Sequence, residues 1–443
     1  MKKTDKLGRP LCFAEYTIYD KTEVLKMIGD RNVYIWGAGQ KGRGFAKALK
    51  RNQIQVAAFV DNDPKRVSHH FDGIPIISAE HFILNHKKFK RSYVFVASVD
   101  VKNKQIFQQL IDLGLSKDSD FTNIQTLSPF YPTIEISGVC NLTCIACPRD
   151  DREMFSDSSR GFMTLERYKP IINKIIREVP FTYLVDLYIW GEPTLNAELP
   201  DIIKYNNRLG IASGLSSNLN SRKHLERIIE ANPSQLRVSI SGYGPNNYEI
   251  THKGGKWKKI YDNLIELKKF KDKYNSDTLI EVYFHANKNN ICETTDIRNL
   301  CNENGYIFHL STSMVFPDFV MKKLEGGVLS PDQLLSIDLM PIPLSEMLQY
   351  AQNNQNKSCL LKRIVPVINW DGSVLTCCNY SYDVMFDNYL NVSLQKIIEA
   401  RYESKLCEKC QKHSLHRYND QVHYGEKIAS YEKKHVSQHI TSK

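Results

Sequence analysis

The sequence predicts an α/β protein with a doubly wound domain first, a partial (β/α)6 barrel next and a small irregular C-terminal domain last. The chain of 443 residues is long enough for two or three domains. Short apolar runs typical of buried strands alternate with amphipathic helical segments up to about residue 330. Beyond that point the alternation stops, and five of the 11 cysteines follow.

The doubly wound domain is expected over residues 28–127. NVYIW (32–36) reads as a buried strand, and a glycine-rich turn and a helical segment follow it. VAAFVDND (56–63) and YVFVAS (93–98) read as further strands. Strands that alternate with helices in this way predict a parallel, Rossmann-like sheet.

The barrel is expected over residues 130–330, beginning with the strand TIEIS (133–137). About six strand–helix units in a row are typical of a full or partial parallel barrel. Right-handed crossovers would place all the strand C-termini on one face, where active sites collect. Further strands are expected at 183–190, 211–215, 236–240, 279–284 and 306–311, and helices at 199–208, 221–231, 256–271 and 293–304.

Composition narrows the functional classes. No apolar run approaches the roughly 18 residues of a membrane span, so no membrane association is expected. The basic N-terminus is not followed by the apolar stretch of a secretion signal, and a cytoplasmic protein is expected. The net charge of +10 is spread widely, so the lysine-rich segments at 256–259 and 268–271 are interpreted as solvated helix faces, not as a nucleic-acid site.

Three cysteines follow the first predicted barrel strand, in GVCNLTCIACPRD (138–150). Cys140, Cys144 and Cys147 have the spacing C-x3-C-x2-C. Structural zinc sites prefer four protein ligands, and no histidine lies nearby in the sequence to complete the set. Three thiolates on a [4Fe–4S] cluster leave one iron open for a small molecule, which suits a catalytic cluster. The spacing therefore favours a catalytic [4Fe–4S] cluster over zinc.

CNLTCIAC on this loop resembles the signature of the radical S-adenosylmethionine (radical SAM) superfamily. In that family the open iron binds the amino and carboxylate groups of SAM, and reductive cleavage gives a 5′-deoxyadenosyl radical that abstracts a substrate hydrogen. The resemblance implies that Cys140, Cys144 and Cys147 hold the cluster, that SAM is a cofactor, and that a reductant such as flavodoxin or ferredoxin supplies the electron. Ala146 stands where the family usually has an aromatic residue.

Three further motifs carry the resemblance over residues 130–315. WGEPTL (190–195) looks like the family's GGEP motif with a tryptophan at its first position. SSNLN (216–220) is similar to the Thr-Asn-Gly turn, and RVSISGYG (237–244) resembles the Val-Ser-Ile-Asp-Gly motif, with Ser241 where Asp is common. The SAM contacts that these motifs imply are Gly191, Glu192 and Pro193 for the ammonium, Ser217 and Asn218 in the turn, and Ser239 near the carboxylate. No residue is predicted as the catalytic acid or base.

The second cysteine group lies in the predicted C-terminal domain, residues 331–425. Two of its members form the C-x2-C pair CEKC (407–410), and the segment 364–377 reads as a hairpin that turns at Asp371-Gly372. The segment resembles the extension of radical SAM enzymes called SPASM, or its shorter twitch form. We infer one auxiliary [4Fe–4S] cluster, and a structural zinc site remains the alternative because spacing does not separate the two metals. The expected ligands are Cys359, Cys377, Cys407 and Cys410, with Cys378 as a spare or as the ligand in place of Cys377.

Residues 426–443 are polar, and a frayed or disordered tail is expected there.

The glycine-rich loop of the first domain matches G-x-G-x-x-G at Gly37, Gly39 and Gly42. Asp61 follows about 20 residues later, at the end of the next strand, as in dinucleotide-binding folds. One interpretation is phosphate binding at a helix N-terminus, and the other is a turn that serves only strand–helix packing. FVDNDPK, with the later GIPIIS, looks like small domains of nucleotide-sugar-modifying proteins, which implies recruitment of a nucleotide-linked sugar.

The sequence therefore predicts a radical SAM enzyme of oxidoreductase or epimerase type that acts on a sugar or nucleotide-linked sugar. A peptide is the rival substrate, because many SPASM enzymes modify peptides. Two alternatives come from other classes: a nucleotide-dependent dehydrogenase whose chemistry lies in residues 32–127, and a non-enzymatic zinc-binding adaptor. Zinc in place of iron in anaerobically purified protein would favour both alternatives over the radical SAM enzyme, and NAD(P)-dependent turnover would separate the dehydrogenase from the adaptor.

Overall fold

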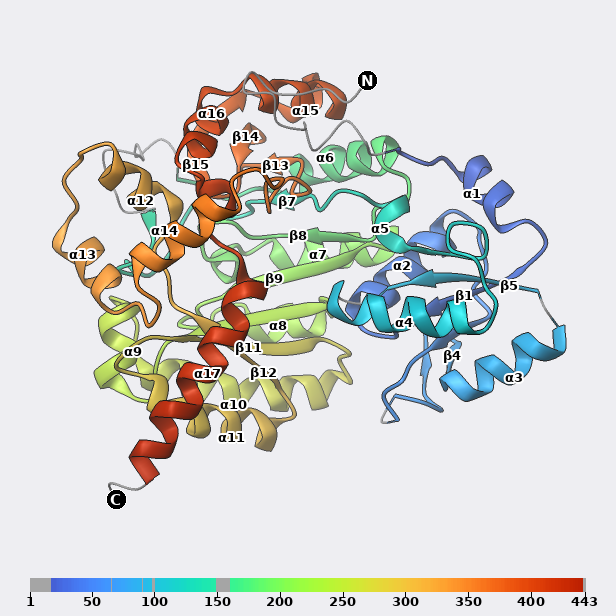
Figure 1. Cartoon of the computed structure of the whole chain (residues 1–443), viewed down its shortest axis with the longest axis horizontal. Helices are drawn as coiled ribbons and strands as arrows, with labels where there is room; N and C mark the ends of the chain where they lie inside the picture. The colour runs from blue at the N-terminus through green and yellow to red at the C-terminus, as the bar shows by residue number, and fades with distance from the viewer. Residues whose placement is uncertain (1–16, 65, 90, 98–99, 149–159, 441–443) are drawn as a thin grey trace.

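The structure is a computed structural model, shown in Figure 1, which describes residues 17–64, 66–89, 91–97, 100–148 and 160–440. Its strands form a six-stranded sheet near the N-terminus and a nine-stranded sheet that runs through the rest of the chain. Figure 1 shows the first sheet at the right and the second across the centre and left.

The N-terminal sheet has the order β3-β4-β2-β1-β5-β6. Its first strand, β1 (Asn32–Trp36), lies inside the sheet and pairs in parallel on both sides, as a doubly wound order requires. The other strands are β2 (Ala58–Val60), β3 (His70–Phe71), β4 (Ile74–Ile77), β5 (Ser92–Val96) and β6 (Phe121–Asn123). The helices are α1 (Lys21–Ile28), α2 (Gln40–Arg51), α3 (Ala79–Phe89), α4 (Asp100–Asp112) and α5 (Ile124–Leu127).

The large sheet contains the predicted run of parallel strands, which lie side by side in chain order from β7 to β12. The strands are β7 (Thr133–Ile134), β8 (Leu184–Asp186), β9 (Ala212–Ser217), β10 (Gln235–Ile240), β11 (Leu279–Ala286) and β12 (Ile307–Thr312). The helices between them include α6 (Leu165–Glu178), α7 (Leu199–Leu209), α8 (Leu225–Glu230), α9 (Pro245–Thr251), α10 (Trp257–Tyr274) and α11 (Thr294–Asn304). Residues of β11 alternate strictly between buried and partly exposed, because one face packs on helices and the other lines a cavity. This arrangement confirms the predicted run of parallel strands in chain order, which is consistent with a partial barrel.

Strand β8 is shorter than the predicted 183–190. After Asp186 the chain leaves the sheet, and the backbone amides of Trp190 and Gly191 donate to the carboxylate of Glu135 on the neighbouring segment. A side chain thus replaces the strand ladder as the hydrogen-bond partner of these amides.

The sheet continues past β7 into the C-terminal region. β13 (Val367–Ile368) pairs in parallel with β7 and antiparallel with β14 (Val374–Cys377), through the predicted turn in which Gly372 has a φ of 93°. The remaining elements are α12 (Pro317–Leu324), α13 (Pro331–Asp338), α14 (Leu344–Asn353), β15 (Tyr380–Phe386), α15 (Leu394–Glu403) and α16 (Lys405–Lys412).

The expectation of a frayed or disordered tail is wrong for residues 426–440. Helix α17 runs from Gln421 to Ile440 and lies along β12, as the red helix of Figure 1 shows. Tyr424 and Ile428 are buried on one face of the helix, four residues apart. Two well-placed apolar side chains therefore hold a segment whose average composition is polar.

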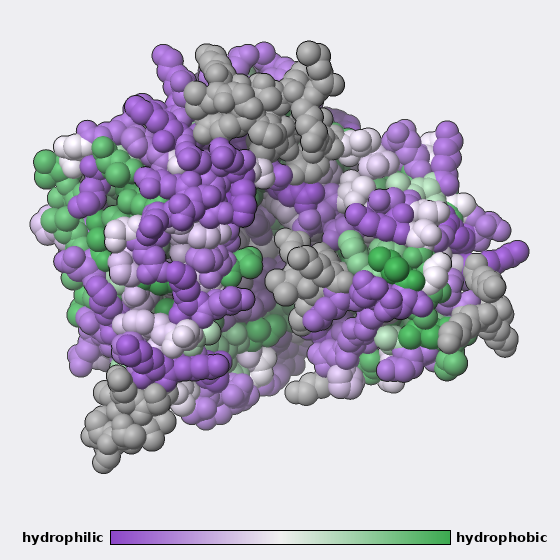
Figure 2. Space-filling model, viewed as in Figure 1, coloured by the Kyte–Doolittle hydropathy of each residue, from purple (hydrophilic) through white to green (hydrophobic). Residues whose placement is uncertain are grey.

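Figure 2 shows that the viewed face is largely hydrophilic, with apolar side chains gathered at its left edge over α12 and α13. Leu324, Val328 and Leu334 are among the exposed apolar residues of that region. Among the helices that the structure describes, none has both the length and the apolar character needed to cross a membrane.

The N-terminal domain shares a hydrophobic core with the barrel. Phe181 and Tyr183, which precede β8, belong to the same cluster of buried side chains as Val33 and Phe45. The rings of Phe45 and Tyr183 meet edge-to-face at 6.1 Å. The two sheets are therefore packed against each other directly.

Arg51, at the end of α2, is the main polar contact of this interface. Burial lowers the pKa of its guanidinium to about 10, so the group remains charged at neutral pH. It donates to four backbone carbonyls at the entrances to β8 and β9: those of Pro180, Thr182, Leu209 and Gly210.

We expect Arg51→Ala to destabilise the protein by about 3 kcal/mol, because four partly buried carbonyls lose a charged donor. Thermal unfolding of the variant, compared with Lys50→Ala, measures the effect. Lys50 lies on the same helix, but its side chain is 70% exposed and pairs only at the surface with Asp72. Equal unfolding temperatures for the two variants would contradict the assigned role of Arg51.

Candidate active site

The cysteine loop follows β7 and is fixed by backbone hydrogen bonds to the segment at the end of α9. The amide of Thr143 donates to the carbonyl of Lys253 at 2.9 Å, and the amide of Ile145 donates to that of Thr251 at 3.2 Å. Cys140, Cys144 and Cys147 are all partly exposed. The fold therefore presents three accessible thiols on one anchored loop, at the end of the barrel where the parallel strands finish.

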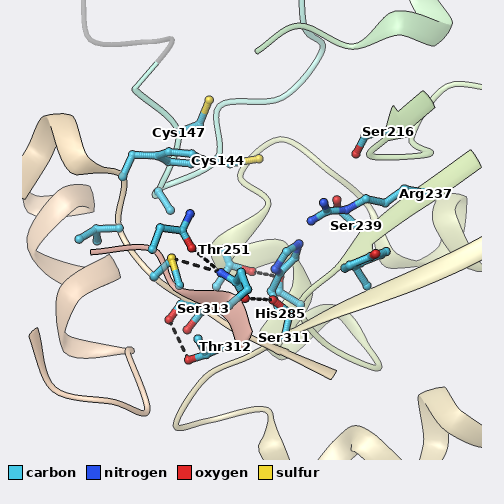
Figure 3. Close-up of a pocket in the computed structure, with 18 of the residues that line it drawn as sticks. Cys144, Cys147, Ser216, Arg237, Ser239, Thr251, His285, Ser311, Thr312 and Ser313 are labelled. Carbon is cyan, nitrogen blue, oxygen red and sulfur yellow. Dashed lines mark hydrogen bonds between the residues drawn. The ribbon is translucent and has the colours of Figure 1, made fainter. Parts of the chain in front are cut away.

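A cavity of about 680 Å³ opens next to this loop. Cys144, Ala146 and Cys147 line one side, and Figure 3 shows the thiols of Cys144 and Cys147 beside it. Hydroxyl and amide side chains make up much of the rest: Ser216, Ser239, Ser241, Thr251, Asn287, Ser311, Thr312, Ser313, Ser336, Asn379, Asn419 and Gln421. Of the SAM contacts implied by resemblance, Ser239 is the one that lines this cavity.

The side chain of Glu192 connects two of the predicted SAM-binding motifs by hydrogen bonds. Its side chain accepts from the Ser217 hydroxyl at 2.7 Å and from the Asn218 amide at 2.8 Å. Asn218 in turn donates from its side chain to the Cys140 Sγ at 3.6 Å. Burial raises the pKa of Glu192, against hydrogen bonds that lower it. The structure thus brings the WGEPTL and SSNLN segments together beside the first cysteine.

Gly191 is required by the approach of two chain segments. A Cβ at this position would lie 1.6 Å from the carbonyl oxygen of Ser137. The next residues continue this packing, since Pro193 is buried at the start of a short 3-10 helix over Pro193–Leu195. The segment 190–193 is therefore pressed against the end of β7, just before the cysteine loop.

Glu135 is a site residue that sequence reasoning missed. Its carboxylate is 3% exposed and accepts from the amides of Trp190 and Gly191, which positions the chain immediately before Glu192. Burial raises its pKa to about 7, although these hydrogen bonds act in the opposite direction. An acidic residue inside the apolar run TIEIS was the signal that could have found it.

The raised pKa of Glu135 predicts a pH dependence of stability. Between about pH 4.5 and 7 the folded protein retains a proton that the unfolded chain has released, so ionisation of Glu135 lowers stability as the pH rises. Glu135→Gln cannot ionise, and its amide oxygen still accepts from Trp190 and Gly191. We expect its melting temperature to rise relative to the wild type between pH 5 and 7. A constant difference over this range would refute the assignment.

Other residues that were not predicted from the sequence line the barrel interior. Asp186, Arg237, Tyr283 and His285 all line the cavity. Burial raises the pKa of Asp186 to about 6, while Arg237 acts to lower it, and burial lowers the pKa of His285 to about 3. A charged residue within an apolar strand was the available signal for Asp186, in YLVDLYIW, and for Arg237, in the predicted strand 236–240.

The structure also brings the C-terminal cysteines together. Cys407 and Cys410 lie three residues apart on α16 and so share one face of the helix. Burial raises the pKa of Cys359 to about 12, and the neighbouring Cys377 adds to this rise. A hydrogen bond from Cys378 lowers the pKa of Cys377. Both cysteines pack against the same apolar core, and Cys378 also lines the cavity.

Both cysteine groups fit iron–sulfur clusters in their donor chemistry. Within the described residues, no three His, Cys, Asp or Glu side chains are arranged around a single metal ion. In a [4Fe–4S] cluster each thiolate binds its own iron, so the ligands need not converge on one point. The anchored three-thiol loop beside Glu192 and the Gly191 segment provides residues suited to a cluster with SAM.

The glycine-rich loop has the predicted strand–turn–helix geometry. A Cβ on Gly42 would lie 1.8 Å from the carbonyl oxygen of Gly37, so close helix packing accounts for this glycine. Gly39 is the N-cap residue of α2. Asp61 accepts from the amide of Ala38 at 2.8 Å. A second cavity, of about 590 Å³, lies beside Asp61 but is not lined by the glycines, and nucleotide binding stays a prediction.

Two sequence-family models match the chain. The model of the Radical SAM superfamily matches residues 134–285, and that of C2185-like, N-terminal, matches residues 29–119. No curated protein sequence matches the chain significantly.

Several solved structures are similar to the chain. BtrN in complex with AdoMet and 2-DOIA shows 15% identity and a TM-score of 0.35, over 65% of this chain and 87% of BtrN. SuiB of Streptococcus suis bound to the precursor peptide SuiA shows 10% identity and a TM-score of 0.43, over 75% and 80%. UDP-D-quinovosamine 4-dehydrogenase from Vibrio fischeri shows 26% identity and a TM-score of 0.20, over 23% of this chain and 82% of that one.

The match over residues 134–285 falls on the cysteine loop, the Glu192 network and the parallel strands described above. The chain therefore contains a radical SAM domain over residues 134–285.

Proposed function

We propose that the enzyme uses a [4Fe–4S] cluster on Cys140, Cys144 and Cys147, together with SAM, to oxidise or epimerise a sugar or nucleotide-linked sugar. When bound, the cluster and SAM supply the 5′-deoxyadenosyl radical that abstracts a substrate hydrogen. The chain's own residues hold the thiolates, orient SAM and shield the cavity from water. Electrons come from a small reductant such as flavodoxin or ferredoxin.

One observation carries the SAM part of the proposal. Asn218 contacts both Glu192, through its backbone amide, and Cys140, through its side chain. A ligand on the open iron would thus lie next to a buried carboxylate, a suitable partner for the methionine ammonium. Gly191 and Pro193 position Glu192, while Ser217 orients its carboxylate and Ser239 offers a hydroxyl from β10.

The lining of the cavity supports a sugar-type substrate. Its many hydroxyl and amide side chains both donate and accept hydrogen bonds, which matches the hydroxyl groups of a sugar. The N-terminal domain adds a nucleotide-binding type of loop at Gly37, Gly39 and Gly42, with Asp61 beside it. We propose that this domain recruits the nucleotide part of the substrate.

Deuterium transfer tests the substrate class. Anaerobically reconstituted enzyme would be incubated with SAM, dithionite and a panel of deuterated free and nucleotide-linked hexoses, and 5′-deoxyadenosine would be analysed by mass spectrometry. Deuterium in 5′-deoxyadenosine identifies the sugar that loses hydrogen. A peptide is the second candidate, because SuiB was crystallised with a precursor peptide. Transfer from deuterated peptides and from no hexose would replace the sugar proposal with the peptide one.

The C-terminal cysteines are proposed to hold an auxiliary [4Fe–4S] cluster on Cys359, Cys377, Cys407 and Cys410, which would accept an electron from the substrate. We expect Cys407→Ala/Cys410→Ala to lower the iron content from about eight to about four atoms per chain. Cys292→Ala, at an isolated and partly exposed cysteine, is the matched control and should leave iron unchanged. If the Cys407→Ala/Cys410→Ala variant lost zinc and kept its iron, the C-terminal cysteines would hold a structural zinc ion.

A further inference from the structure

Arg237 projects from β10 into the cavity on the same side of the strand as Ser239. Figure 3 shows its guanidinium reaching into the space next to Cys144. The guanidinium stacks over the ring of Tyr283, on the neighbouring strand, at 3.9 Å from the ring centre. Tyr283 stacks in turn on His309 of β12, with ring centres 4.5 Å apart. The side chain is thus held by its flat face, which leaves its in-plane N–H groups free to bind.

Those N–H groups lack protein partners among the described residues. The Nε of Arg237 is buried and has no hydrogen-bond partner. Asp186 is the carboxylate that lines the same cavity, yet no ion pair between it and Arg237 is found within 4.0 Å in the described part of the chain. The Asp186 Oδ1 lies against Gly214 of β9 instead, where a Cβ would be only 2.3 Å away.

The side chain of Arg237 is partly exposed to the cavity, and the neighbouring charge of Asp186 makes no ion pair with it, so its N–H groups are available to an anionic ligand. His252 and His285 also line the cavity, and burial lowers the pKa of both, so the two rings are neutral and add no positive charge that would compete with Arg237 for an anion. A planar guanidinium fixed by stacking is suited to bidentate contact with a carboxylate or phosphate.

We propose that Arg237 binds an anionic group of the substrate, a carboxylate or a phosphate ester, and so fixes the sugar between β10 and the cysteine loop. This inference rests on the proposed function, in that the substrate occupies this cavity. It adds that an anionic group of the substrate lies in this cavity and that Arg237 recognises it.

The test uses anaerobically reconstituted holoenzyme with SAM and measures binding by calorimetry. Glucose 1-phosphate probes the phosphate, glucuronate the carboxylate, and glucose is the uncharged match. We expect at least one anion to bind more tightly than glucose, and Arg237→Gln to weaken its binding at least about tenfold. Arg237→Lys, which keeps the charge but not the bidentate geometry, should retain part of the affinity. The anion that responds distinguishes a sugar phosphate from a sugar acid.

Equal anion affinity in wild type and Arg237→Gln would overturn the proposal and leave Arg237 as a structural neighbour of Asp186. The proposal would also be overturned if the wild-type enzyme bound neither anion more tightly than glucose. Iron content shows that each variant is loaded, and if Arg237→Gln loses iron, the lysine variant and the wild-type preference decide. Formation of 5′-deoxyadenosine by the wild type is measured separately, so failure of the anion site is distinguishable from failure of the proposed function.

Discussion

Replacing Cys140, Cys144 and Cys147 together by alanine is expected to reduce 5′-deoxyadenosine formation to the level seen without enzyme. The three thiols are the accessible donors of one anchored loop, and without them no cluster with an open iron remains to bind SAM. Iron should fall by about four atoms per chain, while the C-terminal cysteines keep theirs. Anaerobic reconstitution, iron analysis and chromatography of the SAM products measure both effects.

Cys292→Ala is the control for this triple variant, because Cys292 lies apart from both cysteine groups in the sequence. It should cleave SAM at the wild-type rate. Retention of SAM cleavage in the triple variant would show that the cysteine loop is not the catalytic centre.

Gly191→Ala is expected to slow SAM cleavage at least about a hundredfold, because small displacements of a positioning segment have effects of this size. The added Cβ would lie 1.6 Å from the carbonyl oxygen of Ser137, and a backbone oxygen cannot rotate away. The segment that carries Glu192 must therefore move from the end of β7. The rate of 5′-deoxyadenosine formation at saturating SAM measures the change.

Gly425→Ala gives the matched glycine control. A Cβ there meets no atom within 4 Å, and the residue lies in helix α17. Its SAM cleavage should equal that of the wild type. If Gly191→Ala behaved in the same way, the close packing of the segment would have no role in catalysis.

Much of the fold was predictable because periodicity marks strands and helices directly. The six parallel strands from β7 to β12 coincide with apolar runs of the sequence that are followed by polar motifs. Their order in the sheet is the order expected when consecutive strands are joined by right-handed crossovers. The end of β8 was not predictable, because YLVDLYIW has the composition of a full strand. Beyond it, the amides of Trp190 and Gly191 bond to Glu135, a residue distant in the sequence, and not to a neighbouring strand.

Side chains that act through distant partners were also beyond sequence reasoning. Arg51 and Arg237 are the same residue type. Arg51 binds backbone carbonyls at a domain interface, whereas Arg237 stacks on Tyr283 in the cavity. Local patterns do not tell which way an arginine points. The helix over 426–440 was missed for a related reason, because it depends on distant packing: Tyr424 packs in the C-terminal core with Met347, Ile428 packs in the barrel core, and α17 contacts β12.

The most direct test of the central claim is the metal content of anaerobically reconstituted wild-type protein together with its SAM cleavage under dithionite. We predict about eight irons per chain and formation of 5′-deoxyadenosine. Zinc in place of iron, with no 5′-deoxyadenosine from fully reconstituted protein, would contradict the account.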